Sequence, residues 1–209
     1  GMYEASLNGE RIGDAWLSPG WTSYKNRLQY QVYDVTRQIL SAKNAIAVTL
    51  GNGWFRSPLG WVNNRDIYGK ELGLLAQLHI QYSDGSRQVI ATDESWKSNT
   101  GEIRFSEIYN GETVDLRQEK AGWAKPDFDD SKWPGVTIRD FDKTRLISTI
   151  NETVKAKEVF QPKRIFTSPK GETIIDFGQN LVGWVRIKIN GKAGDSVLVT
   201  HAEVLDKQG

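Results

Sequence analysis

The sequence predicts an all-β protein, organised as an antiparallel β-sandwich. Short segments of alternating or continuous apolar residues recur along the chain, and Gly, Asn, Asp and Pro separate them. Two of the separators, Asn8-Gly9 and Asp84-Gly85, are strong signals for a tight hairpin between adjacent strands. In addition, no segment of helix length carries a sustained apolar stripe with the period of an α-helix.

The first forty residues predict three strands and a helical turn. Residues 3–12 read as two short strands joined by Asn8-Gly9, a type I′ hairpin signal. Residues 27–35 predict a half-buried strand with one wet face, because apolar and polar side chains alternate there. The alternation sets Leu28, Tyr30 and Val32 against Gln29, Gln31 and Tyr33. Residues 36–40 then predict a helical turn.

The rest of the chain is organised around residues 44–61, NAIAVTLGNGWFRSPLGW. The apolar run 44–50, rich in branched residues, predicts a buried strand. A Gly-Asn-Gly triplet follows and breaks the strand, because these residues tolerate a positive φ and a sharp change of direction. Trp54, Arg56 and Trp61 come directly after the break, so the strand delivers aromatic rings and a guanidinium onto one loop.

The second half of the chain continues the β pattern and predicts a domain boundary near residue 150. Apolar runs flank Asp84-Gly85, and shorter strand-like pieces within residues 94–118 are parted by Asn110-Gly111. A polar, strand-poor segment follows, and beyond it GETIIDFG, LVGWVRIKI and DSVLVTHAEV predict three further strands. We therefore expect one β-sandwich domain over residues 1–150 and the start of a second over residues 151–209.

Composition excludes several classes of protein. Lys and Arg number 27 against 26 for Asp and Glu, so the net charge of +1 gives no basic footprint for nucleic acid. No stretch approaches the length of a membrane span. The absence of cysteine excludes disulfides and thiolate metal sites. Eight tryptophans indicate either a heavily aromatic core or a surface that faces sugars.

Several long stretches resemble the N-terminal β-domain of bacterial α-L-rhamnosidases. These stretches are YEASLNGERIGDAWLSPGWTSYKNRLQYQVYDVT, LGNGWFRSPLGW and YNGETVDLR. A further stretch, ETIIDFGQNLVGWVRIKINGKAGDSVLVTHAEVLD, is similar to the start of the next β-sandwich in the same enzymes. The resemblance covers nearly the whole chain and implies a sandwich of the jelly-roll or galactose-binding-like type.

The resemblance also implies where the chemistry lies. Members of the family hydrolyse terminal α-L-rhamnose with inversion, using carboxylates in a downstream barrel of paired helices. An inverting glycosidase needs one carboxyl as acid and another as base, spaced to admit a water. No residue of this chain is assigned a catalytic role, and we expect the chain alone to be inactive. Some members bind rhamnose with calcium through the N-terminal domain. The implied partners are L-rhamnose-containing glycans and the remaining domains of the parent enzyme, in the periplasm or outside the cell.

Two sets of residues are candidates for binding. Trp54, Arg56 and Trp61 suit a sugar, because an aromatic face stacks on the apolar side of a pyranose and arginine donates hydrogen bonds to hydroxyls. The alternative for both tryptophans is packing at the end of the sandwich or against another domain. Oxygen ligands for calcium are available on Asn63, Asn64 and Asp66, although these residue types are more often turn formers.

Other residues carry a simpler interpretation. Asp129 and Asp130 are adjacent, so their side chains point to opposite sides of an extended segment. We expect one of them to cap a turn, with Phe128 and Trp133 packed inward. The two histidines have no metal-spaced or nucleophilic partner, which argues against a zinc or Ser-His site.

Three functions are consistent with these observations. The first is a non-catalytic β-sandwich portion of an α-L-rhamnosidase that supports the catalytic barrel and captures sugar. The second is a stand-alone carbohydrate-binding module. The third is a structural scaffold between domains.

Overall fold

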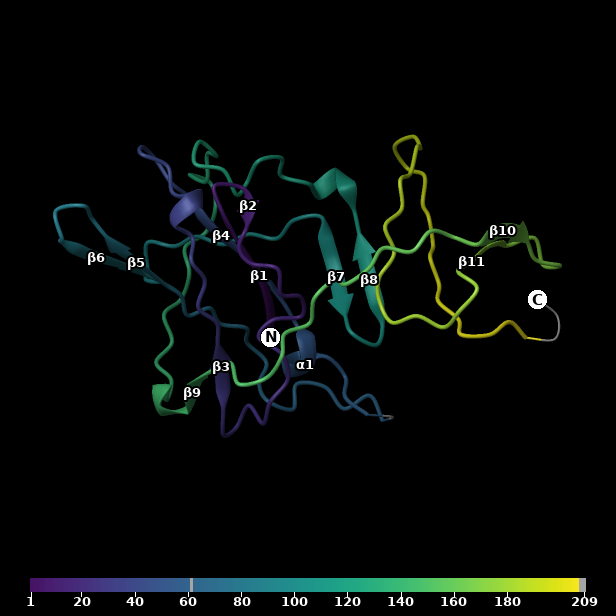
Figure 1. The fold of residues 1–209 in the computed structure, drawn as a ribbon, viewed down its shortest axis with the longest axis horizontal. Helices are drawn as coiled ribbons and strands as arrows, with labels where there is room; N and C mark the ends of the chain where they lie inside the picture. The colour runs from purple at the N-terminus through teal and green to yellow at the C-terminus, as the bar shows by residue number, and fades with distance from the viewer. Residues whose placement is uncertain (61, 207–209) are drawn as a thin grey trace. The chain divides into compact units, whose positions relative to one another are not determined.

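The computed structural model describes residues 1–60 and 62–206 of the chain. It divides into two units, Gly1–Lys155 and Ala156–Gly209, which are described separately (Figure 1). The first unit holds strands β1 (Met2–Leu7), β2 (Glu10–Arg11), β3 (Leu28–Tyr30), β4 (Ile46–Gly51), β5 (Gln77–Gln81), β6 (Arg87–Ala91), β7 (Ile103–Glu107), β8 (Gly111–Val114) and β9 (Leu146–Ser148). Its helical turns are η1 (Thr36–Gln38), α1 (Gly53–Arg56), η2 (Leu116–Gln118) and η3 (Lys143–Arg145). The all-β prediction is confirmed.

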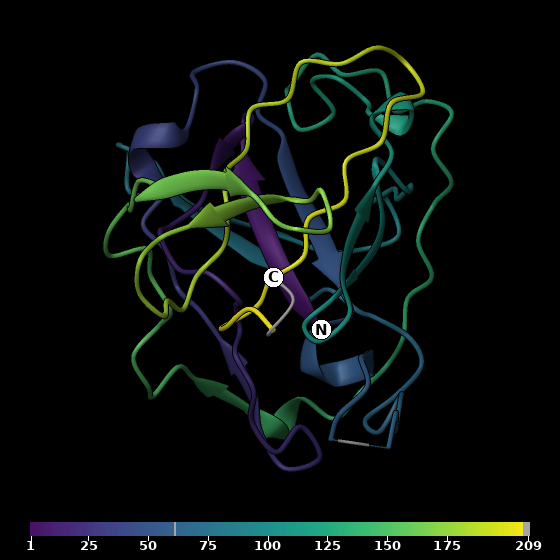
Figure 2. The same cartoon turned by 90° about the vertical axis from the view of Figure 1, so that its right-hand side faces the viewer.

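The sheet at the centre of the first unit has the strand order β2-β1-β4, with antiparallel pairing on both sides of β1 (Figure 2). The hairpin predicted at Asn8-Gly9 is confirmed. Asn8 has φ 57° and Gly9 has φ 83°, the two positive angles that a type I′ turn requires. Six residues of β1 pair with six of β4, from Met2 opposite Gly51 to Leu7 opposite Ile46.

The prediction that residues 44–50 form a buried strand is correct for the strand and wrong for the burial. β4 lies at an edge of the three-stranded sheet, and within it only Ala47 is buried. Leu50 is 37% exposed. A strand becomes fully buried only when other elements cover both of its faces, and the described residues do not cover both faces of β4.

Strand β3 turns its polar side chains inward. The predicted alternation is confirmed, but the wet face carries Tyr30 and, beyond the end of β3, Val32, which are 47% and 84% exposed. Gln29 is buried, and its Nε2 donates to Asn151 Oδ1 at 2.9 Å. Gln31 is bonded to two neighbouring hydroxyl groups. Hydrogen bonds lower the cost of burying an amide, and Gln29 makes one through Nε2 while its buried Oε1 has no partner among the described residues. Polar partners, rather than hydrophobicity, therefore decide which face of β3 points inward.

The remaining strands of the first unit form pairs. β5–β6 is the antiparallel hairpin predicted at Asp84-Gly85, and the strand-like pieces parted by Asn110-Gly111 form a further antiparallel hairpin, β7–β8. The glycine of each turn has a positive φ, 85° at Gly85 and 76° at Gly111. The short pair β3–β9 is parallel and brings Leu28 opposite Leu146. The helical turn predicted over residues 36–40 is confirmed as η1.

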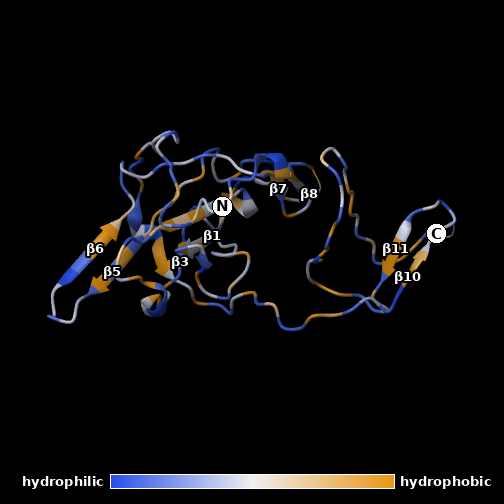
Figure 3. Ribbon diagram, turned by 90° about the horizontal axis from the view of Figure 1, so that it is seen from above, coloured by the Kyte–Doolittle hydropathy of each residue, from blue (hydrophilic) through white to orange (hydrophobic). Residues whose placement is uncertain are grey.

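The second unit contains the antiparallel hairpin β10 (Arg164–Thr167) and β11 (Thr173–Asp176), whose apolar positions are orange in Figure 3. β11 confirms the strand predicted in GETIIDFG. The strands predicted in LVGWVRIKI and DSVLVTHAEV are absent from the described residues. A strand requires a hydrogen-bonded neighbour, and the described part of this unit supplies none for these two segments.

The buried interior of the described residues is small and partly polar. Its apolar members are Leu7, Ala15, Tyr24 and Ala47. Among the buried residues that the structure describes, Glu107 alone is charged at neutral pH. Over the same residues, no helix has the length and apolar character that crossing a membrane requires.

Candidate functional site

The short helix α1 is placed by a glycine that no other residue could replace without strain. Gly53 has φ 49°, and a Cβ atom there would lie 2.6 Å from Met2 Cγ and 2.9 Å from the Met2 backbone nitrogen. The strand break predicted at the Gly-Asn-Gly triplet is therefore confirmed. The helix runs over residues 53–56 directly after β4, so it carries Trp54 and Arg56 beyond the end of the central sheet.

Trp54 lies against a second tryptophan that is distant in sequence. The rings of Trp21 and Trp54 are 5° from parallel, with centroids 6.3 Å apart. Trp21 is 52% exposed, and its Nε1 donates a hydrogen bond to the Tyr68 hydroxyl at 3.3 Å. The fold thus presents an aromatic pair with a hydroxyl at its side. Trp21 was not a predicted site residue, because its turn is separated from α1 by more than thirty residues.

A second group of rings supports this pair. Tyr24 packs edge-on against Tyr68, with centroids 4.9 Å apart, and Phe55 lies 5.8 Å from Tyr24. Tyr24 is 5% exposed, and its hydroxyl donates to the Gly20 carbonyl at 2.7 Å. Burial, with a smaller contribution from Tyr68, raises the pKa of Tyr24 to about 12. These rings are connected to the pair through Tyr68, whose hydroxyl accepts the hydrogen bond from Trp21.

Arg56 points to a different partner from Trp54. Its Nε donates to Asp66 Oδ1 at 3.2 Å, and the backbone nitrogen of Asp66 donates to the Arg56 carbonyl at 3.2 Å. Residues two apart on a helix do not face each other, so Trp54 and Arg56 project in different directions from α1. The two side chains of this ion pair are 34% and 28% exposed, and therefore remain reachable from solvent.

The residues predicted as calcium ligands are mostly engaged in the loop itself. Asn63 has φ 48°, and the Asn64 carbonyl accepts from the Leu59 backbone nitrogen at 3.0 Å. Asp66 is paired with Arg56. Within residues 1–60 and 62–206, no group of three or more His, Cys, Asp or Glu side chains could hold a metal ion. The calcium assignment stays a prediction, and Trp61 lies outside the described residues.

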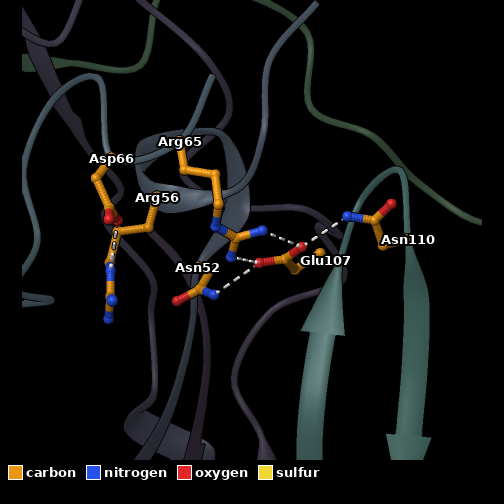
Figure 4. A network of polar contacts seen from close by, with 6 residues as sticks. All are labelled: Asn52, Arg56, Arg65, Asp66, Glu107 and Asn110. Atoms are coloured by element: carbon orange, nitrogen blue, oxygen red, sulfur yellow. Dashed lines mark hydrogen bonds and ion pairs between the residues drawn. The ribbon is translucent and has the colours of Figure 1, made fainter. Parts of the chain in front are cut away.

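The most extensive polar network next to the loop is centred on Glu107, the last residue of β7 (Figure 4). Its side chain is fully buried and forms an ion pair with both terminal nitrogens of Arg65, at 3.0 Å for Nη1 to Oε2. Asn52 Nδ2 donates to Oε1 at 3.3 Å, and Asn110 Nδ2 donates to Oε2 at 2.9 Å. One carboxylate therefore accepts hydrogen bonds from three different side chains.

This environment favours the charged form of Glu107. The hydrogen bonds from Arg65 lower the pKa of the carboxyl below its ordinary value of 4.5, and they outweigh the opposing effect of burial. Sequence reasoning did not select Glu107, because a single glutamate at the end of a strand resembles any solvated residue. In the structure, the complete burial of its side chain distinguishes Glu107 from a solvated surface glutamate.

The Asp129–Asp130 stretch has the structural role that the sequence predicts. Asp129 Oδ1 accepts from the Ser131 backbone nitrogen at 3.0 Å, as a turn-capping aspartate does. Phe128 and Trp133 pack edge-on with centroids 5.4 Å apart. Asp130 is ion-paired with Lys97 at 2.8 Å. These two carboxylates stabilise a loop and do not face one another.

Comparison with known proteins identifies the family. The model of the α-L-rhamnosidase N-terminal domain matches residues 1–158, and the model of the bacterial α-L-rhamnosidase concanavalin-like domain matches residues 166–209. The chain belongs to the α-L-rhamnosidase family. It corresponds to the N-terminal, non-catalytic portion of such a protein, as the resemblance predicted.

The relatives are much longer than this chain. An α-L-rhamnosidase from Streptomyces avermitilis is 42% identical over all of this chain but only 20% of its own length. The structure of the α-L-rhamnosidase from Aspergillus terreus matches with a TM-score of 0.86 and 45% identity, over 88% of this chain and 21% of its own. The Streptomyces avermitilis α-L-rhamnosidase in complex with L-rhamnose matches with a TM-score of 0.87 and 38% identity, over 93% and 19%. The chain thus spans about a fifth of the length of these rhamnosidases.

Proposed function

We propose that this chain is the accessory portion of an enzyme that hydrolyses terminal α-L-rhamnose, and that it captures rhamnose-containing glycans through its aromatic pair. The exposed ring of Trp21, which lies parallel to the half-buried ring of Trp54, supports the proposal most directly. An aromatic face stacks on the C–H side of a pyranose, and a 6-deoxy sugar adds a methyl group to that apolar side. The Tyr68 hydroxyl lies beside the pair and offers a hydrogen-bond partner.

Bond cleavage is assigned to the rest of the parent protein. An inverting glycosidase needs a carboxylic acid of raised pKa facing a carboxylate base across a water. Glu107 has a lowered pKa and is ion-paired with Arg65, so it does not serve as a general acid at neutral pH. Asp129 and Asp130 are engaged in turn and ion-pair contacts. These three carboxylates thus have structural partners.

A titration of the chain with L-rhamnose, followed by tryptophan fluorescence and by calorimetry, tests the binding proposal. We expect a dissociation constant of about 1 mM, or roughly −4 kcal/mol, because immobilising a small sugar offsets much of the stacking energy. The titration is repeated with calcium and with a chelator, which tests the calcium assignment separately. No heat and no fluorescence change up to saturating sugar would rule out capture by this chain.

The half-buried position of Trp54 favours one second candidate, a docking surface for another domain. Under this alternative the exposed ring of Trp21 is covered in the parent protein. Hydroxyl-radical footprinting of the parent protein and of this chain distinguishes sugar capture from domain docking. Protection of Trp21 in the parent protein without sugar supports docking, and protection that appears only with rhamnose supports capture.

A further inference from the structure

Glu107 connects the two ends of the segment that carries the candidate site. Asn52 immediately precedes α1, and Arg65 lies in the loop that follows α1. Both side chains bond to the same buried carboxylate (Figure 4). Asn110 fills the remaining position from the turn of the β7–β8 hairpin. The carboxylate is therefore the common attachment point for residues 52–65.

The other contacts of this segment are apolar packing or lie within the loop: the Phe55 ring lies 5.8 Å from Tyr24, and Gly53 lies against Met2. The loop is closed by the Leu59–Asn64 backbone bond at 3.0 Å and by the partly exposed Arg56–Asp66 pair. Those two polar contacts join the loop to itself. Within the described residues, the side chains of Asn52 and Arg65 are bonded to β7 through its last residue, Glu107. A buried, charge-assisted network is stiffer than surface contacts, so it adds a rigid polar anchor to the apolar packing of α1.

We infer that Glu107 is the positioning residue of the aromatic site: it holds α1 in the orientation that sets the ring of Trp54 parallel to Trp21. The consequence for sugar binding rests on the proposed function, whereas the consequence for ring geometry does not. Glu107 itself is buried and contacts no ligand in this scheme. Its effect reaches the site through Asn52 at the start of the helix and through Arg65 at the end of the loop.

The test compares Glu107→Gln with Glu112→Gln, an exposed glutamate of β8 that serves as the matched control. Near-ultraviolet circular dichroism reports the coupling of the two indole rings, and a Trp21→Phe variant defines the part of the signal that belongs to the pair. We expect Glu107→Gln to remain folded by far-ultraviolet dichroism yet to lose the pair signal. If the presenting conformation falls to one molecule in ten, L-rhamnose affinity falls about tenfold. Glu112→Gln should change neither the pair signal nor the L-rhamnose affinity.

A purely stabilising ion pair would behave differently. It would lower the unfolding midpoint of Glu107→Gln but leave the ring signal and the rhamnose affinity of the folded protein unchanged, and that result would overturn the inference. If Glu107→Gln does not fold, the Asn52→Ala variant tests the inference instead. This substitution removes the hydrogen bond from Asn52, next to α1, to Glu107 and leaves the Arg65–Glu107 pair intact. Retention of the full pair signal in folded Asn52→Ala would then count against positioning. If the wild-type chain fails to bind rhamnose, the proposed function is wrong. The inference about Glu107 is then tested by the near-ultraviolet signal of the Trp21–Trp54 pair alone.

Discussion

Arg56 Nε lies 3.2 Å from Asp66 Oδ1, so a residue predicted to contact sugar is ion-paired with a residue predicted to bind calcium. The two predictions therefore depend on each other. A cation bound at Asp66 would compete with the guanidinium for the same carboxylate oxygen. In the structure, the pair instead closes the loop that follows α1, together with the backbone bond from Asp66 to Arg56.

Breaking this pair should cost little stability. We expect Asp66→Asn to lower the free energy of unfolding by about 0.5–1 kcal/mol, because both side chains are partly exposed and solvent screens their attraction. Urea unfolding measures the change, and Glu71→Gln provides a control in which an exposed pair with Arg139 is broken with almost no effect. If calcium stabilises the wild type but not Asp66→Asn, the carboxylate is a metal ligand after all.

Replacing Gly53 should destabilise the first unit. In Gly53→Ala, the new Cβ approaches the Met2 backbone at a residue whose φ is 49°, and we expect a loss of about 1–3 kcal/mol. Gly73→Ala is the control, since a Cβ there meets no atom within 4 Å, and its effect should stay within about 0.5 kcal/mol. Thermal or urea unfolding of the two variants gives the comparison. Equal midpoints would show that the turn does not need its glycine.

Removing the exposed ring should weaken sugar binding. We expect Trp21→Ala to reduce L-rhamnose affinity roughly tenfold, which corresponds to about 1.4 kcal/mol of lost stacking. Trp184→Ala removes a tryptophan of nearly equal exposure, 54% against 52%, from the second unit and should leave the affinity unchanged. Calorimetric titration of both variants measures the difference. Similar affinities for the two variants would place any bound sugar away from the aromatic pair.

The Glu107–Arg65 pair should make the first unit sensitive to acid. The folded-state pKa of Glu107 is lowered below its ordinary value of 4.5, so its contribution is complete above that pH. The contribution is lost as the pH falls through the lowered value, because the proton that Glu107 then takes up removes its charge. Urea unfolding from pH 7 to pH 3 should show a steeper decline in stability for the wild type than for Glu107→Gln. If stability declined with pH equally in the wild type and in Glu107→Gln, ionisation of Glu107 would not contribute to stability.

Much of the local structure followed from the sequence. The hairpins at Asn8-Gly9 and Asp84-Gly85 depend on backbone angles that few residue types adopt, so adjacent residues suffice to predict them. The break before α1 follows from Gly53 for the same reason. The face that β3 turns inward did not follow, because the partner of Gln29 is Asn151, more than a hundred residues away.

The candidate site shows the same limit. Trp54 and Arg56 were selected from the sequence, whereas Trp21, Tyr68 and Glu107 were not, since no local pattern distinguishes them from surface residues. The sequence by itself determined the all-β class, the turns and the family, because these depend on neighbouring residues and on extended similarity. Tertiary structure alone decided which rings stack, which carboxylate is buried and which predicted ligands pair with each other. Those outcomes depend on contacts between distant segments, and the burial that gives such contacts their strength exists only in the folded chain.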